Sequence, residues 1–392
     1  MKKMRAKSEI GENLFLYLPS EMIIDILSRL DVRTAMRGKC VCKPWLDLLT
    51  TPEFVKAHLS KSISRLIITE RVIHITDEGY WNYNSETHKM VDELNLNCDW
   101  HSLNKVFNLD LPFRMAIQSS INGLLLEHSV NRILCNPITR EYIKLPCPRQ
   151  PSTALALEFH GFGVSRVSGQ YKVVRISAEG PPQTPVHLYS GEAECQVYTL
   201  GTGLWRRIGQ CGHWKHLADN SNSMKMSFLC GYLHWWWRST AISAPTKIYR
   251  LDLETECFST FSCPRAISNK ERHLSSLRGC LCVCDNSNLG IIIWVMKEYG
   301  NEKSWSVEFS ILKDNTPIWD GLQQLNPIEV FKNGDMLLSW RQGRPIYYSS
   351  TTKAIQEVDL HDSEDDMRYQ ISLYTPSLLS LKTFATENVI SF

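Results

Sequence analysis

The sequence shows no excess of charge of either sign. Its 43 Lys and Arg residues stand against 41 Asp and Glu residues, for a formal net charge of +2. This balance argues against a nucleic-acid-binding protein, because such proteins concentrate basic residues. The chain also lacks an apolar run long enough to span a bilayer, since its longest run, Leu289–Met296, has the length of a buried strand. We therefore expect neither a nucleic-acid nor a membrane partner.

A secretory signal is also missing. The first 14 residues are basic and contain no long apolar stretch, so we expect an intracellular protein of the cytoplasm or nucleus. Residues 1–14 are interpreted as a flexible basic tail, with a nuclear import signal in residues 1–7 as the alternative. The 13 cysteines are an odd number in a chain without secretory context, which predicts free thiols.

Motifs of common enzyme classes are absent as well. The sequence has no G-x-S-x-G elbow, no Walker loop and no H-E-x-x-H helix. Gly161-Phe162-Gly163 lacks the third glycine and the strand–helix setting of a dinucleotide-binding loop. We therefore predict no catalytic residue and no cofactor.

Cysteines and histidines do not form a metal-binding pattern. Cys280, Cys282 and Cys284 alternate along one strand face, a spacing unlike that of zinc ligands, so they are interpreted as small buried hydrophobes. His213 and His216 lie in the segment CGHWKHL without a further ligand signal. This segment is predicted to be a polar loop between two structural repeats, and no metal is expected.

Residues 18–49 read as short helices ahead of a longer β-rich region. Ser20 is predicted to cap the first helix, Thr34 the second, and Pro44 to take the first position of the third. Thr51-Pro52-Glu53 predicts the start of a fourth helix. A stretch this short cannot bury its apolar residues alone, so the following domain or another protein must cover them.

This stretch resembles an F-box, the helical module that docks on a SKP-family adaptor of cullin–RING ubiquitin ligases. The resemblance is carried by the features Leu18-Pro19, the isoleucine-rich first helix, Val41-Cys42-Lys43, Trp45 and Leu48-Leu49. It implies that adaptor-binding residues come from the set Leu18, Pro19, Ile23, Ile26, Leu27, Leu30, Val41, Trp45 and Leu49. We expect this set to mix contact residues with residues of the module's own core.

Three positions depart from the F-box pattern. Asp31 stands where the family usually has proline, and Ala35 and Gly38 stand where larger apolar residues are usual. Glycine lowers helix stability, and both small residues remove contact area. These departures predict weaker adaptor binding and support a second hypothesis, in which the F-box has decayed.

Beyond residue 65 a turn pattern repeats at roughly 50 residues, the size of a four-stranded kelch-type propeller blade. Each copy has an apolar strand, a polar turn with threonine and a hydrophobic residue three positions on. Its threonines are Thr87, Thr139, Thr202, Thr255 and Thr352. A degenerate copy, Gly300-Asn301-Glu302 with Trp305, gives the sixth unit.

A second turn series runs in step with the first, and each of its members precedes an apolar strand. Its members are Asn122-Gly123, Gly169-Gln170, Cys230-Gly231, Arg278-Gly279 and Asn333-Gly334. The two series together predict a propeller of about six blades, with two stacked β-sandwiches as the competing fold. The segment containing residues 371–374 and 378–381 is expected to supply a strand that closes the first blade.

The repeat region resembles the F-box-associated region of plant F-box proteins. The resemblance is carried by INGLLL, ILCNPITREYIKLP, GFGVSR, YKVVRI and CQVYTLGTGLWRRIG, and covers residues 115–265 best. It implies a plant source and a kelch-like propeller that holds substrates. The predicted chain is thus an α+β multidomain protein, with an F-box at 15–62 and a propeller at 63–392.

Two segments of the propeller are candidates for partner contact. Trp235, Trp236 and Trp237 form a run in which packing between blades is expected for at least two, while Trp236 and Arg238 are the candidate substrate-binding residues. The acidic run at residues 361–366 is interpreted as a solvated loop.

These observations favour a non-catalytic substrate receptor of an SKP–cullin–F-box ubiquitin ligase. The helical module would bind a SKP-family adaptor, and through it the cullin and RING subunits. The propeller would hold an unidentified protein substrate near the charged conjugating enzyme, so that proximity drives the transfer. The alternative is a ligase-independent propeller scaffold with a degenerate F-box.

Overall fold

The structure is a computed structural model, and it describes most of the helical and β-rich regions. The described residues are 18–75, 81–91, 106–109, 111, 117–127, 132–148, 156–179, 190–215, 226–237, 247–264, 272–287, 290–312, 325–340, 343–358 and 367–392. The predicted basic tail at 1–14, Arg238 and the acidic run at 361–366 lie outside them.

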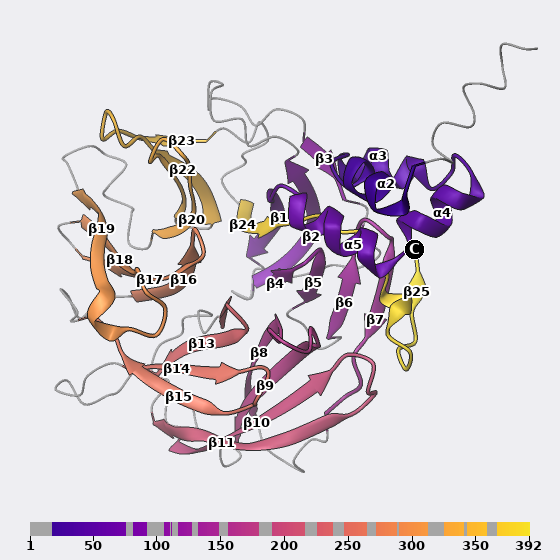
Figure 1. The fold of residues 1–392 in the computed structure, drawn as a ribbon. Helices are drawn as coiled ribbons and strands as arrows, with labels where there is room; N and C mark the ends of the chain where they lie inside the picture. Colours follow the sequence, from indigo (N-terminus) through magenta and orange to yellow (C-terminus); the bar gives the residue numbers. More distant parts are fainter. Residues whose placement is uncertain are drawn as a thin grey trace, which may run out of the picture.

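Four helices precede the first strand in the described residues. They are α2 (Ser20–Leu27), α3 (Val32–Gly38), α4 (Lys43–Leu49) and α5 (Pro52–Lys61). We call this unit, Ser20–Lys61, the helical module. Its helices agree with the four predicted from the sequence, and in Figure 1 they gather at one side of the β-rich ring.

The caps of the first two helices differ from the prediction. Ser20 is the first residue of α2, and Pro19 holds the N-cap position without a side-chain hydrogen bond. Thr34 does not cap α3. Asp31 does, because its Oδ1 accepts hydrogen bonds from the backbone N–H groups of Arg33 at 3.0 Å and Thr34 at 3.1 Å. Carboxylates are among the best N-caps, since they satisfy N–H groups that lack a partner in the first turn.

The later two helices follow the prediction more closely. Helix α4 begins at Lys43, so Pro44 takes its second position instead of its first. Thr51 caps α5, and its Oγ1 accepts a hydrogen bond from the N–H of Phe54 at 3.2 Å. The start signal predicted at Thr51-Pro52-Glu53 is confirmed.

Six antiparallel sheets stand around a ring, which confirms the six-blade propeller and excludes the two-sandwich fold (Figure 1). Blade 1 has the strand order β24-β1-β2-β3, from β24 (Met367–Tyr374), β1 (Arg65–Ile75), β2 (Trp81–Val91) and β3 (Val106–Asn108). Blade 2 has the order β4-β5-β6-β7-β25, from β4 (Ile117–Ile121), β5 (Leu124–Glu127), β6 (Ile133–Asn136), β7 (Glu141–Lys144) and β25 (Ile390–Ser391).

The other four blades each follow the chain in order. Blade 3 contains β8 (Ala156–Val164), β9 (Tyr171–Glu179), β10 (Ser190–Thr199) and β11 (Trp205–Lys215). Blade 4 contains β12 (Ser227–Leu229), β13 (Tyr232–Trp237), β14 (Lys247–Asp252) and β15 (Phe258–Ser262). Blade 5 contains β16 (Arg272–Leu277), β17 (Cys280–Asn286), β18 (Gly290–Met296) and β19 (Trp305–Leu312). Blade 6 contains β20 (Asn326–Val330), β21 (Met336–Trp340), β22 (Arg344–Tyr348) and β23 (Ile355–Glu357).

The ring is closed by a strand from late in the sequence. Strand β24 pairs with β1 from Arg65↔Tyr374 to Val72↔Met367, so blade 1 joins segments from both ends of the propeller region. This confirms the closing strand predicted at residues 371–374. Residues 378–381 do not extend it, since the chain there leads into the 3-10 helix η6 (Leu381–Thr383).

The glycine turn series occupies a constant place in the blades. The glycine-containing turns join the first and second strands of blades 2 to 6. Asn122 and Gly123 have φ angles of 51° and 83°, and Cys230 and Gly231 have 52° and 84°. Two successive positive φ angles match the right-handed twist of a tight hairpin, which explains why glycine recurs there.

The threonine turns precede the fourth strand in blades 2, 3, 4 and 6, and the degenerate copy forms the 3-10 helix η3 (Glu302–Ser304) before β19. The prediction for Thr87 is wrong. This residue lies inside β2 and pairs with Glu70, because β1 and β2 continue as a long ladder past a bulge at Val72/Ile73.

The tryptophan that ends two of these turns joins neighbouring blades. Trp205 Nε1 donates to the carbonyl of Pro146 in blade 2 at 2.7 Å, and Trp305 Nε1 donates to the carbonyl of Ser262 in blade 4 at 3.2 Å. In these two blades the tryptophan three positions after the turn therefore bonds the backbone at or just beyond the fourth strand of the preceding blade.

The Gly161-Phe162-Gly163 motif marks a close contact between blades 3 and 4. A Cβ atom on Gly161 would lie 2.5 Å from Met226 Sδ, and one on Gly163 would lie 2.4 Å from Leu253 Cδ1. The glycines therefore leave room for the neighbouring sheet.

The cysteine-rich strand β17 confirms the packing interpretation. Cys282 and Cys284 are buried free thiols, and burial raises the pKa of Cys282 to about 12. Strand β18 confirms the buried strand predicted around Leu289–Met296. The described residues contain no helix long and apolar enough to cross a membrane.

One loop prediction is wrong in part. His213 lies in β11 and pairs with Glu192 of β10, so residues 211–215 form the end of a strand. The ladder with β10 carries this strand farther than its polar sequence suggested. His216 lies outside the described residues.

Candidate functional site

The helical module has a small apolar core to which all four helices contribute. Its fully buried members are Leu27, Val32, Ala35, Leu49 and Phe54, each at most 3% exposed. Two residues from outside the module complete this core, Leu378 from the chain after β24 and Ile138 from the turn between β6 and β7. The following domain therefore covers part of the module, as its size requires.

The predicted adaptor-binding residues divide into three groups. Pro19, Ile26 and Val41 are exposed, with Ile26 at 44% and Val41 at 64%. Leu18, Ile23, Leu30 and Trp45 are half-buried. Leu27 and Leu49 are buried in the core of the module, so they belong to the part of the set that was expected to form that core.

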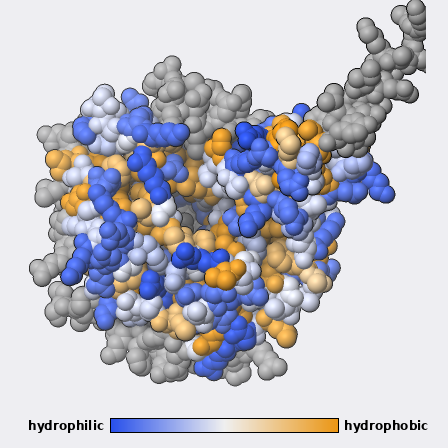
Figure 2. Space-filling model, viewed as in Figure 1, coloured by the Kyte–Doolittle hydropathy of each residue, from blue (hydrophilic) through white to orange (hydrophobic). Residues whose placement is uncertain are grey.

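Two further exposed apolar residues were not predicted. Met22 is 52% exposed and Leu46 is 42% exposed. Met22 precedes Ile26 by four residues, so both lie on one face of α2, and this spacing was the available signal. We call Met22, Ile26, Val41 and Leu46 the exposed apolar set of the module. Figure 2 shows hydrophobic surface on the module at the upper right of the molecule.

The three departures from the F-box pattern serve the module's own structure. Asp31 caps α3, Ala35 is completely buried, and Gly38 is buried against α4. A Cβ on Gly38 would lie 3.0 Å from Leu49 Cδ1. The small residues allow α3 and α4 to approach closely, so they have a packing role within the module.

Polar contacts fix α2 against α5 on another side of the module. The Asp25 carboxylate pairs with Lys61 Nζ at 2.6 Å and with Arg29 Nη2 at 2.8 Å, and the hydrogen bonds from Lys61 and then Arg29 lower the pKa of Asp25. His58 is 2% exposed, and its Nε2 lies 3.1 Å from the carbonyl of Leu30. Burial lowers the pKa of His58 and so keeps the imidazole neutral.

The tryptophan run is only partly described. Trp235 is 3% exposed and stacks on Tyr249 with ring centroids 6.2 Å apart, in the core between blades 3 and 4. This confirms the packing role for one of the three tryptophans. The side chain of Trp236 and all of Arg238, the two candidate substrate-binding residues, lie outside what the structure describes.

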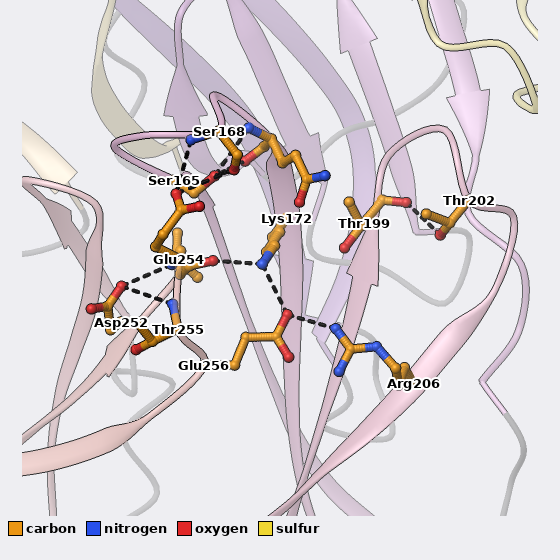
Figure 3. A network of polar contacts seen from close by, with 12 residues as sticks. Ser165, Ser168, Lys172, Thr199, Thr202, Arg206, Asp252, Glu254, Thr255 and Glu256 are labelled. Atoms are coloured by element: carbon orange, nitrogen blue, oxygen red, sulfur yellow. Dashed lines mark hydrogen bonds and ion pairs between the residues drawn. The ribbon is translucent and has the colours of Figure 1, made fainter.

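A polar network joins blades 3 and 4 (Figure 3). Lys172 Nζ pairs with the Glu256 carboxylate at 2.9 Å, and Arg206 Nη2 pairs with the same Oε1 at 2.6 Å. Glu254 Oε2 accepts hydrogen bonds from the N–H groups of Val167 at 3.1 Å and Ser168 at 3.0 Å. These contacts run between blade 3 and blade 4, so this network fixes the blades to each other.

Within the described residues, no group of three or more His, Cys, Asp or Glu side chains is placed to hold a metal ion. The titratable clusters described above bind each other across helices or blades. The exposed apolar set of the helical module is therefore the strongest candidate for a functional surface in the described part of the chain.

Comparison with known proteins agrees with this organisation. Residues 15–59 match the F-box-like family and residues 73–380 match the F-box associated beta propeller domain family. The F-box protein CPR1 of Arabidopsis thaliana is 25% identical, over 92% of this chain and 88% of its own length. The Arabidopsis thaliana F-box/kelch-repeat protein At3g23880 is 27% identical, over 83% of this chain and 89% of its own length. The chain thus belongs to the F-box-associated beta-propeller family and is a plant F-box protein.

Proposed function

We propose that this chain is the substrate-recognition subunit of an SKP–cullin–F-box ubiquitin ligase. The observation that carries the proposal is the exposed apolar set Met22, Ile26, Val41 and Leu46, on a module whose core is otherwise closed. Membership of the F-box family supports the same conclusion.

The surroundings of this set suit a protein interface. Exposed charged residues lie within four residues of its members in the sequence, namely Glu21, Arg37, Lys43 and Asp47. Stable interfaces combine an apolar centre with a polar rim. An adaptor that covers the apolar side chains would remove them from water and leave the charged rim solvated, which favours binding without burying unpaired charge.

In this proposal the propeller contributes only by holding the substrate in place. A substrate held on the ring, while the module is bound to the adaptor, lies in the same particle as the ubiquitin-conjugating enzyme. The effective concentration of its lysines near that enzyme rises accordingly. This chain forms no bond with ubiquitin in the proposal, so it is a receptor and not an enzyme.

The alternative is a ligase-independent scaffold with a decayed F-box, and it rested on Asp31, Ala35 and Gly38. These residues cap and pack the module, which supports the receptor over the scaffold.

Co-purification with a SKP-family adaptor tests the proposal. The double variant Met22→Asp/Ile26→Asp places two charges in the apolar set without touching the buried core. Leu312→Asp is the matched control, because Leu312 is 74% exposed on the outer strand of blade 5. We expect the wild type and the control to retain the adaptor and the double variant to lose it. A folded wild type that retains no adaptor would overturn the proposal and revive the scaffold.

A further inference from the structure

The chain after β24, residues 375–392, contacts three parts of the molecule in turn. Leu378 is 2% exposed and lies in the core of the helical module. The chain then passes blades 2 and 3 and ends in strand β25, which pairs with β7. Figure 1 shows β25 beside β7 and below the helices.

Blade 2 holds the start of this segment through a buried side chain. Asn136 is completely buried, and its Nδ2 donates to the carbonyl of Ser377 at 3.1 Å and to that of Leu379 at 2.7 Å. These two carbonyls flank Leu378. Asn136 therefore fixes the backbone on both sides of the residue that enters the module.

A carboxylate holds the next turn. Glu141 of β7 is 6% exposed, and it accepts hydrogen bonds from Ser380 Oγ at 2.9 Å and from the N–H of Leu381 at 2.7 Å. Hydrogen bonds to a charged acceptor are stronger than neutral ones. Leu381 is itself fully buried in the core between blades 2 and 3.

The far end of the segment has its own anchors. Glu387 accepts hydrogen bonds from Tyr198 Oη at 2.7 Å and from the N–H of Gly201 at 2.8 Å, both in blade 3. The N–H of Phe392 donates to the carbonyl of Arg140 at 3.0 Å. The segment is thus fixed on both sides of its contact with the module.

We propose that residues 375–392 form a strap that completes the fold of the helical module and holds it on blade 2. The module has only four short helices, a size at which little apolar surface is buried without outside contacts. Leu378 supplies such a contact from a backbone that the propeller has already fixed. The module is therefore not an independent folding unit.

Hydrogen exchange of the full-length chain tests the strap. Leu378→Ala removes most of the side chain in the module core, and Leu312→Ala makes the same change at an exposed position. We expect amide exchange in α2 to α5 to speed up at least about tenfold in Leu378→Ala and to stay unchanged in Leu312→Ala. Exchange in β9 and β10, which Leu378 does not contact, should be unchanged in both.

A second variant separates the strap from a local packing defect. Asn136→Ala leaves Leu378 in place but removes the two hydrogen bonds that flank it, together with the hydrogen bond that Asn136 accepts from the N–H of Ile138. Faster exchange in the helices of both variants supports the strap. The proposal is overturned if the helices exchange at the wild-type rate in either variant, or if β9 and β10 loosen as much as the helices. No adaptor is used, so the result is independent of the proposed ligase role.

Discussion

The imidazole Nε2 of His234 lies 2.7 Å from the hydroxyl of Tyr299, and this hydrogen bond joins blades 4 and 5. His234 Nδ1 lies 3.1 Å from the carbonyl of Ser227. Burial lowers the pKa of His234 to about 4, so the imidazole is neutral at pH 7 and carries one proton. Because a carbonyl only accepts, that proton is on Nδ1, and Nε2 accepts from Tyr299.

This neutral histidine predicts loss of stability in mild acid. In the unfolded chain the pKa of His234 returns to about 6.5, so between pH 6.5 and 4 the unfolded state binds more protons and stability falls as pH falls. Between pH 7.5 and 5 this histidine should cost about 2 kcal/mol of unfolding free energy. Buried His88, with its pKa also lowered to about 4, acts in the same direction.

Urea unfolding at pH 7.5 and pH 5 measures the effect. His234→Gln should reduce the pH-dependent loss by about 2 kcal/mol, since the titrating group is gone. Tyr299→Phe is the control, because it removes the hydroxyl and leaves the imidazole to titrate. An unchanged pH dependence in His234→Gln would contradict the assignment.

The cap of α3 gives a second prediction. Asp31→Ala should lower the stability of the helical module by about 1 kcal/mol, because two N–H groups lose their acceptor. Asp31→Ser keeps a capping oxygen and should retain most of the stability. Amide exchange in α3 measures both, and exchange at the wild-type rate in Asp31→Ala would show that the cap contributes nothing.

The close packing of α3 on α4 gives a third prediction. Gly38→Leu forces a large side chain against Leu49 and should cost about 1–3 kcal/mol. Gly38→Ala adds one methyl group at the limit of contact and gains helix propensity, so its effect should stay within about 1 kcal/mol. Thermal unfolding of the two variants distinguishes them. If Gly38→Leu were as stable as the wild type, α3 and α4 could move apart without loss of stability.

The contact between blades 3 and 4 gives a fourth prediction. Lys172 is 4% exposed, so Glu256→Gln leaves a buried ammonium without its carboxylate and should cost about 3 kcal/mol. Arg206 has 59% of its side chain exposed and binds the same carboxylate. Arg206→Ala should therefore cost less than about 1 kcal/mol. Similar losses in urea unfolding would refute this division of roles.

The positions of the hairpin turns could be predicted from the sequence because their geometry is local. Asn122-Gly123 adopts two positive φ angles, which few other residue pairs tolerate. At Thr87 the prediction from local sequence failed. The sequence around it reads as a turn, but its pairing with Glu70 in a neighbouring strand keeps it extended.

The exposed apolar set of the module was only half predictable for a related reason. Ile26 and Leu27 are adjacent and equally apolar, but one is 44% exposed and the other 3%. Helical period alone cannot choose between two apolar faces. Leu378 and Ile138, which lie far along the chain, complete the core on one side and leave Met22 and Ile26 on the other.

Ring closure by β24 also determines when the fold can be completed during synthesis. The first strand of the propeller, β1, is synthesised early. Its second edge stays unpaired until residues 367–374 have been synthesised. Leu378 follows only a few residues later, so the sheet and the helices are completed almost together. Until then a nascent chain presents an open strand edge, the feature that chaperones must shield from other chains. A chain truncated before this point could complete neither blade 1 nor the helical module.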